Sequence, residues 1–243
     1  MTIISQRKIQ NILLRSLSPE SFAQVSGDFK ARNFPLRTSL LSPGESIEVV
    51  TYPETCVVSV VATTAEGRQA EVGLVGVEGL VGIAAVFGEN HSPIDCFTQV
   101  PGDALQLPVR SFTAVMESNA DFRAVHLRYA HSFLIQVSHS ALAYSAYNVV
   151  ERLARWLLMT HDRSRTDDIV ITHEFLSLML GVRRAGVTTA LQSIVRLGYI
   201  STHRGRVGIL DRTGLEELAG DSYGTPEAAY RRAFTLSPGD ATN

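Results

Sequence analysis

The stretch that decides the fold reads ITHEFLSLMLGVRRAGVTTALQSIVRLGYISTHRGRVGIL and spans residues 171–210. It contains two short segments with helical apolar spacing, a glycine between them and a basic turn near its end. Between residues 172 and 210, five arginines stand against one acid, Glu174, which gives a formal net charge of +4 with histidine neutral. The arginines are Arg183, Arg184, Arg196, Arg204 and Arg206. The whole chain has a formal net charge of −2, so this basic segment indicates a local anionic partner.

The first half of this stretch predicts a helix over 173–180. Thr172 is a favourable N-cap residue, because its hydroxyl can accept a hydrogen bond from a backbone N–H of the first turn. The apolar face of this helix is formed by Phe175, Leu176 and Met179. Gly181 suits the tight turn that follows, where the backbone needs a left-handed conformation.

The second half predicts another helix over 183–197, with Gly198 as the residue just past its end. The spacing turns Val187, Leu191, Ile194 and Val195 inward. It leaves Arg183, Arg184, Thr188, Thr189, Gln192 and Arg196 outward. Two strands, 199–202 and 207–210, follow and are joined through Arg204-Gly205-Arg206.

Helix, glycine turn, helix and basic hairpin form the pattern of a winged helix-turn-helix. The second helix of such a motif enters the major groove of DNA, where arginine can donate two hydrogen bonds to guanine and threonine can contact the thymine methyl group. The hairpin places its arginines beside phosphates. We therefore expect DNA binding through Thr172, Arg183, Arg184, Thr188, Thr189, Gln192, Arg204 and Arg206. The competing interpretation is an ordinary solvated basic helix face, which leaves the cap, the turn and the hairpin unexplained.

The composition is that of a globular protein with one large or two ordinary domains. Of its 243 residues, 45% are hydrophobic and 19% charged. No apolar run reaches the roughly 18 residues of a membrane-spanning helix, and residues 1–17 lack the pattern of a secretory signal. The two cysteines, Cys56 and Cys96, are expected to be buried thiols in a reducing cytoplasm. Cytoplasmic localisation is thus predicted.

The remaining chain predicts an α+β fold in several parts. Helical spacing begins the chain, and Ser18-Pro19 reads as an N-cap followed by the first residue of a second helix. Short β-branched runs separated by Gly or Pro fill 32–110 and predict a small antiparallel barrel or sandwich, with a hairpin around AEGRQ at 65–69. The predicted domains are 1–117, a sensor; 118–147, a dimerisation helix; 148–222, the DNA-binding domain; and 223–243, a mobile tail.

Residues 118–145 contain neither Gly nor Pro and predict one long helix. A helix of this length extends about 42 Å, too far to be covered by one small barrel. The plainer interpretation is a bridge between two domains, and the sharper one is pairing with a second copy of the chain. The predicted dimer stripe is Phe122, Val125, Tyr129, Phe133 and Gln136.

Residues 10–215 resemble the Crp/Fnr family of bacterial transcription regulators. The resemblance lies in the barrel, the long helix, VVERLARWLL at 149–158 and the spacing from Thr172 through Gly181 to Leu197 and the basic wing. It implies a homodimer, a cyclic-nucleotide-binding-like β-roll, a palindromic DNA operator and RNA polymerase as a partner. Where the family often has Arg-Glu in the second helix, this chain has Arg184-Ala185, so the family's half-site preference does not transfer.

The resemblance also implies an effector site in the β-roll, which departs from the family pattern. The best register places Gly82-Ile83 at the Gly-Glu position of cyclic-AMP-binding members and Pro93-Ile94 near the Arg-Ser position. The candidate effector residues are Gly82, Ile83, Pro93, Ile94 and Ser138. No arginine lies between Arg68 and Arg110, so a cyclic phosphate lacks its charge-assisted partner. Cyclic AMP bound in the usual way is not expected, and the effector is unknown or absent.

We expect no cofactor and no enzymatic activity. Two cysteines cannot ligate a usual iron–sulfur cluster, and no spacing selects a haem ligand among His91, His126, His131 and His139. No metal-ligand cluster, phosphate-binding loop or nucleophile motif occurs in the sequence. The alternative function is a ligand-binding or interaction module of the same fold without regulated DNA binding.

Overall fold

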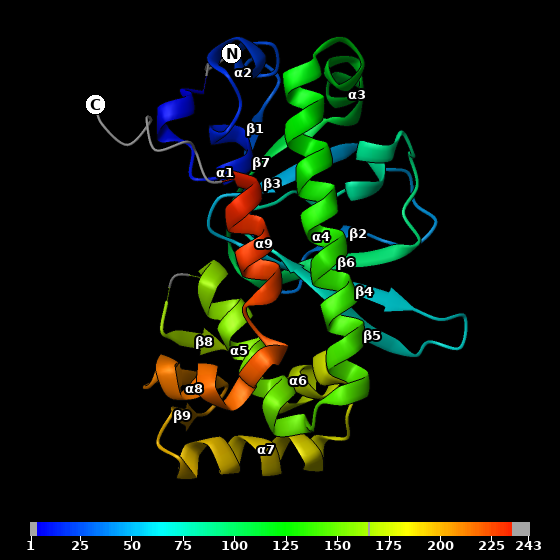
Figure 1. Ribbon diagram of the computed structural model, residues 1–243. Helices are drawn as coiled ribbons and strands as arrows, with labels where there is room; N and C mark the ends of the chain where they lie inside the picture. Colours follow the sequence, from blue (N-terminus) through cyan, green and yellow to red (C-terminus); the bar gives the residue numbers. More distant parts are fainter. Residues whose placement is uncertain (1–3, 165, 235–243) are drawn as a thin grey trace.

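The computed structural model describes residues 4–164 and 166–234. It places a β-roll with short N-terminal helices at one end of an elongated molecule and a mainly helical C-terminal domain at the other, with one long helix along the side (Figure 1). The fold is α+β, as the sequence predicts. The predicted tail beyond residue 234 lies outside the described residues.

The N-terminal segment is divided into short pieces rather than one continuous helix. These are η1 (Gln6–Lys8), α1 (Ile12–Arg15) and α2 (Pro19–Ala23). The Ser18 hydroxyl accepts a hydrogen bond from the Ser21 N–H, which confirms the predicted cap with Pro19 at the first helical position. The spaced apolar residues Ile9, Leu13 and Leu17 are all buried. Their packing against the β-roll holds this segment in place.

The β-roll consists of two antiparallel sheets around one core. The first has the order β1-β7-β3, from Lys30–Phe34, Gly102–Pro108 and Val49–Pro53. The second has the order β2-β6-β4-β5, from Ser39–Leu41, Ile94–Val100, Val57–Thr63 and Gln69–Val75. The predicted hairpin is confirmed, with Thr63 opposite Gln69 across its turn. A 3₁₀ turn, η2 (Ile83–Phe87), follows β5 and precedes β6 in the chain.

The long helix α4 (Ala120–Ala146) is preceded by α3 (Val109–Ser118), which the sequence did not predict as a separate helix. All five residues of the predicted dimer stripe are buried within their own chain. Gln136, for example, accepts a hydrogen bond from Leu74 N at 2.7 Å and donates one to Leu74 O at 3.2 Å. That prediction was therefore wrong about the face: this stripe packs on the β-roll of its own chain.

Tight approach between α4 and the β-roll explains two of the glycines. A Cβ on Gly73 would lie 2.9 Å from the Phe133 ring. A Cβ on Gly79 would likewise collide with the Tyr129 side chain. These glycines therefore make room for aromatic rings from α4, which is a structural role rather than a ligand-binding one.

The C-terminal domain is built around a second core. Its elements are α5 (Val149–Ser164), β8 (Asp168–Val170), α6 (His173–Leu180), α7 (Arg184–Arg196), β9 (Ile200–His203), β10 (Arg206–Ile209), α8 (Arg212–Ala219) and η3 (Gly220–Ser222). The three strands form one sheet in the order β8-β10-β9. The apolar faces of α5, α6 and α7 meet in this core, which includes Leu157, Leu176 and Ile194.

A further helix, α9 (Thr225–Phe234), occupies residues that the sequence indicated as a mobile tail. It lies beside α4 (Figure 1). The Tyr230 hydroxyl donates to the Glu78 carbonyl at 2.8 Å, and the Arg128 guanidinium lies 5.8 Å from the centre of the Phe234 ring. A few aromatic side chains, rather than a continuous apolar stripe, attach α9 to the protein. Apolar periodicity in the sequence therefore did not indicate this helix.

Candidate nucleic-acid interface

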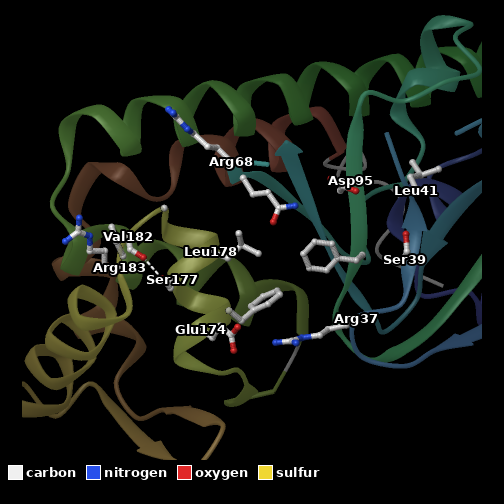
Figure 2. Close-up of a pocket in the computed structure, with 14 residues that line it drawn as sticks. Arg37, Ser39, Leu41, Arg68, Asp95, Glu174, Ser177, Leu178, Val182 and Arg183 are labelled. Atoms are coloured by element: carbon white, nitrogen blue, oxygen red, sulfur yellow. Dashed lines mark hydrogen bonds between the residues drawn. The ribbon is translucent and has the colours of Figure 1, made fainter. Parts of the chain in front are cut away.

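The turn between α6 and α7 follows from local residue chemistry. The Thr172 hydroxyl accepts a hydrogen bond from the Phe175 N–H at 3.2 Å and caps α6. At the other end Gly181 has φ +60°, in the left-handed region that glycine adopts without steric cost. The Gly181 and Val182 N–H groups donate to Leu178 O and Ser177 O, which is the Schellman arrangement. The Ser177 hydroxyl also donates to the Val182 carbonyl (Figure 2).

Helix α7 is the outermost element at the end of the molecule opposite the N-terminal helices (Figure 1). Its inward side chains Val187, Leu191 and Ile194 are buried, as predicted. Val195 is 38% exposed, so its predicted inward position was wrong. The helix turns by about 100° per residue, which carries Val195 past the edge of the buried face.

Four of the eight predicted DNA-contacting side chains lie on α7 or at its N-cap and are exposed: Arg183, Arg184, Thr189 and Gln192. Arg196, which was predicted to face outward, is exposed as well. The hydroxyl of Thr189 donates to the Ala185 carbonyl of its own helix, and its methyl group remains available for an apolar contact. The outer face of α7 thus presents guanidinium, amide and methyl groups to the solvent.

Two predicted residues are committed to internal hydrogen bonds. The Thr172 hydroxyl serves as the cap of α6. The Thr188 hydroxyl lies 3.1 Å from His173 Nδ1 and also donates to the Arg184 carbonyl. Thr188 therefore connects α7 to α6 and is only half exposed. Its position favours a role in holding the two helices together.

The wing is a two-residue hairpin turn, since His203 pairs with Arg206 and Gly205 has φ +72°. Arg204 is exposed at the tip. Arg206 forms an ion pair with Asp168 at 2.6 Å, and both side chains are about half exposed. Neither Asp168 nor the strand β8 that carries it was identified from the sequence. The run of three β-branched residues at 169–171, Ile-Val-Ile, is the signal that could have found this strand.

The candidate effector residues do not form one site. Gly82, Ile83 and Ile94 line a cavity inside the β-roll, together with Tyr129 and Phe133. Pro93 and Ser138 are not part of this lining, and both are exposed. Gly82 has φ +99°, so its left-handed backbone accounts for a glycine there.

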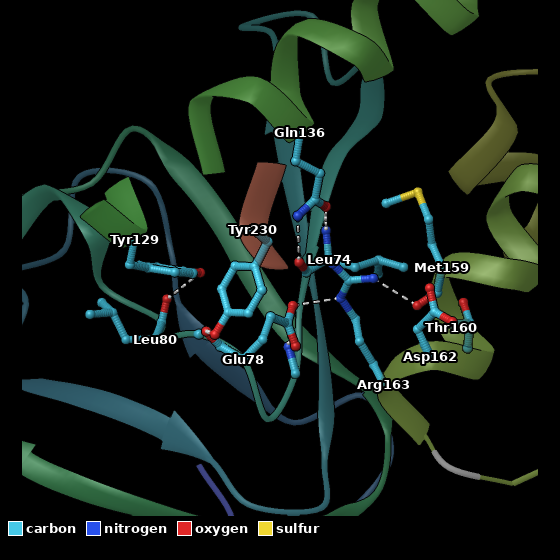
Figure 3. A network of polar contacts seen from close by, with 12 residues as sticks. Leu74, Glu78, Leu80, Tyr129, Gln136, Met159, Thr160, Asp162, Arg163 and Tyr230 are labelled. Atoms are coloured by element: carbon cyan, nitrogen blue, oxygen red, sulfur yellow. Dashed lines mark hydrogen bonds and ion pairs between the residues drawn. The ribbon is translucent and has the colours of Figure 1, made fainter. Parts of the chain in front are cut away.

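The cavity inside the β-roll is nearly filled by the protein itself. Its volume is about 10 Å³, which holds one water at most. The Tyr129 ring lies in it and its hydroxyl donates to Leu80 O (Figure 3). Close by, the Arg163 guanidinium donates to Glu78 at 2.7 Å, and Gln136 is bonded to Leu74 (Figure 3). A nucleotide-sized ligand has no room in this interior.

His126, one of the four histidines considered as haem ligands, has both ring nitrogens occupied. Because a carbonyl can only accept, Nδ1 donates to Phe122 O at 2.7 Å, and Nε2 accepts from the Tyr52 hydroxyl at 2.8 Å. Burial lowers the pKa of His126 to about 4. Over residues 4–164 and 166–234, no group of three or more His, Cys, Asp or Glu side chains is arranged to hold a metal ion. In the same ranges no helix is long and apolar enough to cross a membrane.

Comparison with known proteins matches part of the C-terminal region of the chain to one family. Residues 151–218 match the family model of the Crp-like helix-turn-helix domain. A search of curated proteins finds no relative of the chain.

Solved structures match nearly the whole chain. One is described as a transcriptional regulator of the Crp/Fnr family from Eubacterium rectale, with 17% identity over 85% of this chain and 97% of that one and a TM-score of 0.68. A Crp-family regulator from Thermus thermophilus has 20% identity over 78% and 96%, with a TM-score of 0.66. FixK2 from Bradyrhizobium japonicum has 13% identity over 79% and 98%, with a TM-score of 0.68. The chain therefore has the fold of Crp/Fnr transcriptional regulators and carries a Crp-like helix-turn-helix domain.

Proposed function

We propose that this chain, with its Crp-like helix-turn-helix domain on a Crp/Fnr-type fold, is a dimeric transcription regulator of the cytoplasm that binds a specific DNA sequence. One observation carries the proposal: the outer face of α7 and the wing tip are solvent-exposed and belong to a segment of net charge +4 in a chain of net charge −2. A basic face of this kind supplies the phosphate contacts on which most DNA affinity depends.

The two basic elements take different parts in DNA binding. The first turns of a recognition helix reach base edges in the major groove. Arg183 and Arg184 stand at the start of α7, and Thr189 follows one turn later. Arg204 at the wing tip meets the phosphate backbone. Arg206 reaches a phosphate by exchanging its ion pair with Asp168 for one with DNA, at little cost because exposed pairs contribute about 0–1 kcal/mol.

The dimer forms through the outer face of α4, on the side away from the β-roll. Leu127, Leu134 and Leu142 are 45%, 61% and 46% exposed. Their spacing of seven and eight residues places them on one side of the helix, as in a coiled-coil seam. His131, between the first two leucines, is also exposed. A two-fold dimer through this seam presents two copies of α7, which fits a palindromic operator.

Regulation by cyclic AMP in the usual way is not part of the proposal. The filled β-roll interior of about 10 Å³ supports this. The lack of any arginine between Arg68 and Arg110 supports it independently.

The test of the proposal is binding to DNA across a salt series. Duplexes selected from a random pool by the purified protein are compared with scrambled duplexes in gel shifts. Binding through several phosphates makes the logarithm of the affinity fall linearly with the logarithm of the salt concentration. We expect a steep slope on both duplexes and tighter binding to the selected one. Binding that is weak and insensitive to salt would leave the alternative of an interaction module without DNA binding.

A further inference from the structure

A wide cleft separates the β-roll from the DNA-binding domain. It has a volume of about 950 Å³ and opens to solvent. One wall comes from the second sheet of the β-roll and the loop before it. The opposite wall is α6 and its turn into α7 (Figure 2). A molecule in this cleft touches both domains at once.

The floor of the cleft is apolar. Leu41 and Phe97 come from the β-roll side, and Phe175, Leu178 and Val182 from the α6 side. The Phe97 and Phe175 rings pack edge to face with their centres 5.8 Å apart. This contact is made across the two domains. The apolar floor selects a ligand with a hydrocarbon or aromatic body.

Arginines from three separate segments stand around this floor: Arg37, Arg68 and Arg183. Arg37 reaches from the β-roll side toward α6 (Figure 2). Its guanidinium carbon lies 5.8 Å from the centre of the Phe175 ring. Guanidinium groups at the edge of an apolar floor select an anionic group at one end of the ligand.

Arg37 also has a strained backbone. Its φ of +63° makes it the one non-glycine residue with positive φ among residues 4–164 and 166–234. The Arg37 N–H donates to Thr98 O at 2.8 Å, which holds this conformation. Such strained residues cluster at functional sites, because the surrounding structure must hold them at a cost. An asparagine adopts this conformation more easily than arginine does, so the choice of arginine here favours a use for its side chain.

Two acids, Asp95 and Glu174, also line the cleft. Asp95 accepts a hydrogen bond from the Thr63 hydroxyl at 2.6 Å, which directs one of its oxygens to the protein. Glu174 is exposed on α6. Arg68 is ion-paired with Glu66 at 3.0 Å, which leaves Arg37 as the arginine best placed to bind an anionic group in the cleft.

Two other cavities offer less to a ligand. The β-roll interior is filled. A cavity of about 270 Å³ under α9 is lined by charged groups that already satisfy one another. Arg163 is paired there with Glu78, and Arg212 with Asp162.

We propose that the cleft between the β-roll and α6 is the effector site of this protein, and that its ligand is a small amphipathic organic anion. The apolar body lies on Phe97, Phe175 and Leu178, and the anionic group is bound by Arg37. The regulatory part of this inference rests on the proposed function, whereas the binding of the anion does not. Because α6 leads directly through Gly181 into α7, a ligand that joins α6 to the β-roll selects one orientation of α7. It changes DNA affinity to the extent that it binds that orientation more tightly.

The test uses decanoate and its neutral counterpart 1-decanol as probes. Both displace 8-anilinonaphthalene-1-sulfonate, whose fluorescence reports its binding to the DNA-free, full-length protein. We expect decanoate to bind the unaltered protein about tenfold or more tightly than decanol, as loss of one charge-assisted hydrogen bond implies.

Three variants separate the contribution of Arg37 to binding from that of the apolar floor. Arg37→Asn introduces a residue that tolerates positive φ. It should lower the affinity for decanoate about tenfold and leave the affinity for decanol unchanged. Leu178→Ala should weaken both probes, because it removes part of the floor. Arg32→Asn is the matched control, since Arg32 is exposed on β1 outside the cleft, and it should change neither probe. Equal affinity of the two probes, or no effect of Arg37→Asn, would overturn the proposal.

A second measurement separates the two proposals. Gel shifts on the selected duplex are repeated with and without saturating decanoate. A change in DNA affinity that is lost in Arg37→Asn supports the effector role. If decanoate binds as expected but the protein binds no DNA at all, the proposed function fails and the anion site stands. If DNA is bound but decanoate is not, the anion site fails and the proposed function stands.

Discussion

The buried carboxyl of Glu71 provides the sharpest quantitative test of how the two domains are joined. Glu71 lies on β5 of the β-roll and is only 6% exposed. Its Oε1 accepts a hydrogen bond at 2.8 Å from the indole N–H of Trp156 on α5. Its Oε2 has no partner among the described residues. We predict that Glu71→Gln stabilises the folded protein increasingly as the pH rises.

The magnitude follows from the pKa of this carboxyl. Burial raises the pKa of Glu71 from 4.5 to about 8, although the nearby Ser59 hydroxyl, the Trp156 hydrogen bond and the charges of Arg155 and Arg163 act in the opposite direction. Below pH 4.5 the carboxyl is protonated in both the folded and the unfolded chain, so its ionisation does not change the free energy of unfolding. Between 4.5 and about 8 it ionises only in the unfolded chain, so stability is lost steadily as the pH rises. Above the folded pKa the loss is complete, at roughly 5 kcal/mol.

Urea unfolding from about pH 5 to about pH 9 measures this difference. The gain in Glu71→Gln should be small at the acid end and reach a few kcal/mol at the alkaline end. Glu66→Gln is the matched control, because Glu66 is exposed on the hairpin next to Glu71 and its side chain is 76% exposed. A gain in Glu71→Gln that is the same at every pH would refute the reasoning.

Fluorescence provides an independent measurement on the folded protein. Trp156 is the only tryptophan in the sequence, and its indole N–H is bonded to the titrating group. Its emission should therefore change with an apparent pKa of about 8. The same titration of Glu71→Gln should be flat. A titration that survives the substitution would assign the transition to another group.

Four further predictions concern DNA binding, assembly and acid stability. Arg184→Ala should cost roughly 1–3 kcal/mol on the selected operator and much less on scrambled DNA, because it removes base readout; equal losses on both duplexes in gel shifts would contradict this. Arg206→Ala should weaken both duplexes alike and lower the salt slope by about one per half-site; an unchanged slope would exclude a phosphate contact. Leu134→Glu should give a folded monomer in sedimentation, since Leu134 is exposed within the chain, whereas Leu36→Glu, at a similarly exposed site away from α4, should leave the dimer intact. The pKa of His126 is lowered from 6.5 to about 4, so the folded protein should lose roughly 3 kcal/mol of stability as the pH falls from 6.5 to about 4. In urea unfolding, His126→Gln should make the stability depend less on pH over this range.

The helix-turn-helix geometry of the candidate DNA interface could be predicted from the sequence because its signals are local. The Thr172 cap, the left-handed Gly181 and the position of Gly198 each depend on residues within one helical turn. The charge of the segment is fixed by composition. Val195 was misplaced because it stands at the edge of the apolar stripe, where periodicity does not decide between packing and exposure.

The sequence by itself thus determined the turn chemistry of the helix-turn-helix and the location of its positive charge, because each is set by neighbouring residues. The tertiary structure decided which face of α4 covers the β-roll. This helix carries large apolar residues on both sides, with Phe122 and Tyr129 on one and Leu127 and Leu134 on the other, so periodicity alone assigns neither. The contact of Glu71 with Trp156 joins positions 85 residues apart, and no local pattern encodes it. No local pattern encodes the cleft between Arg37 and α6 either, since its walls come from segments of the β-roll and of α6 that lie far apart in the sequence.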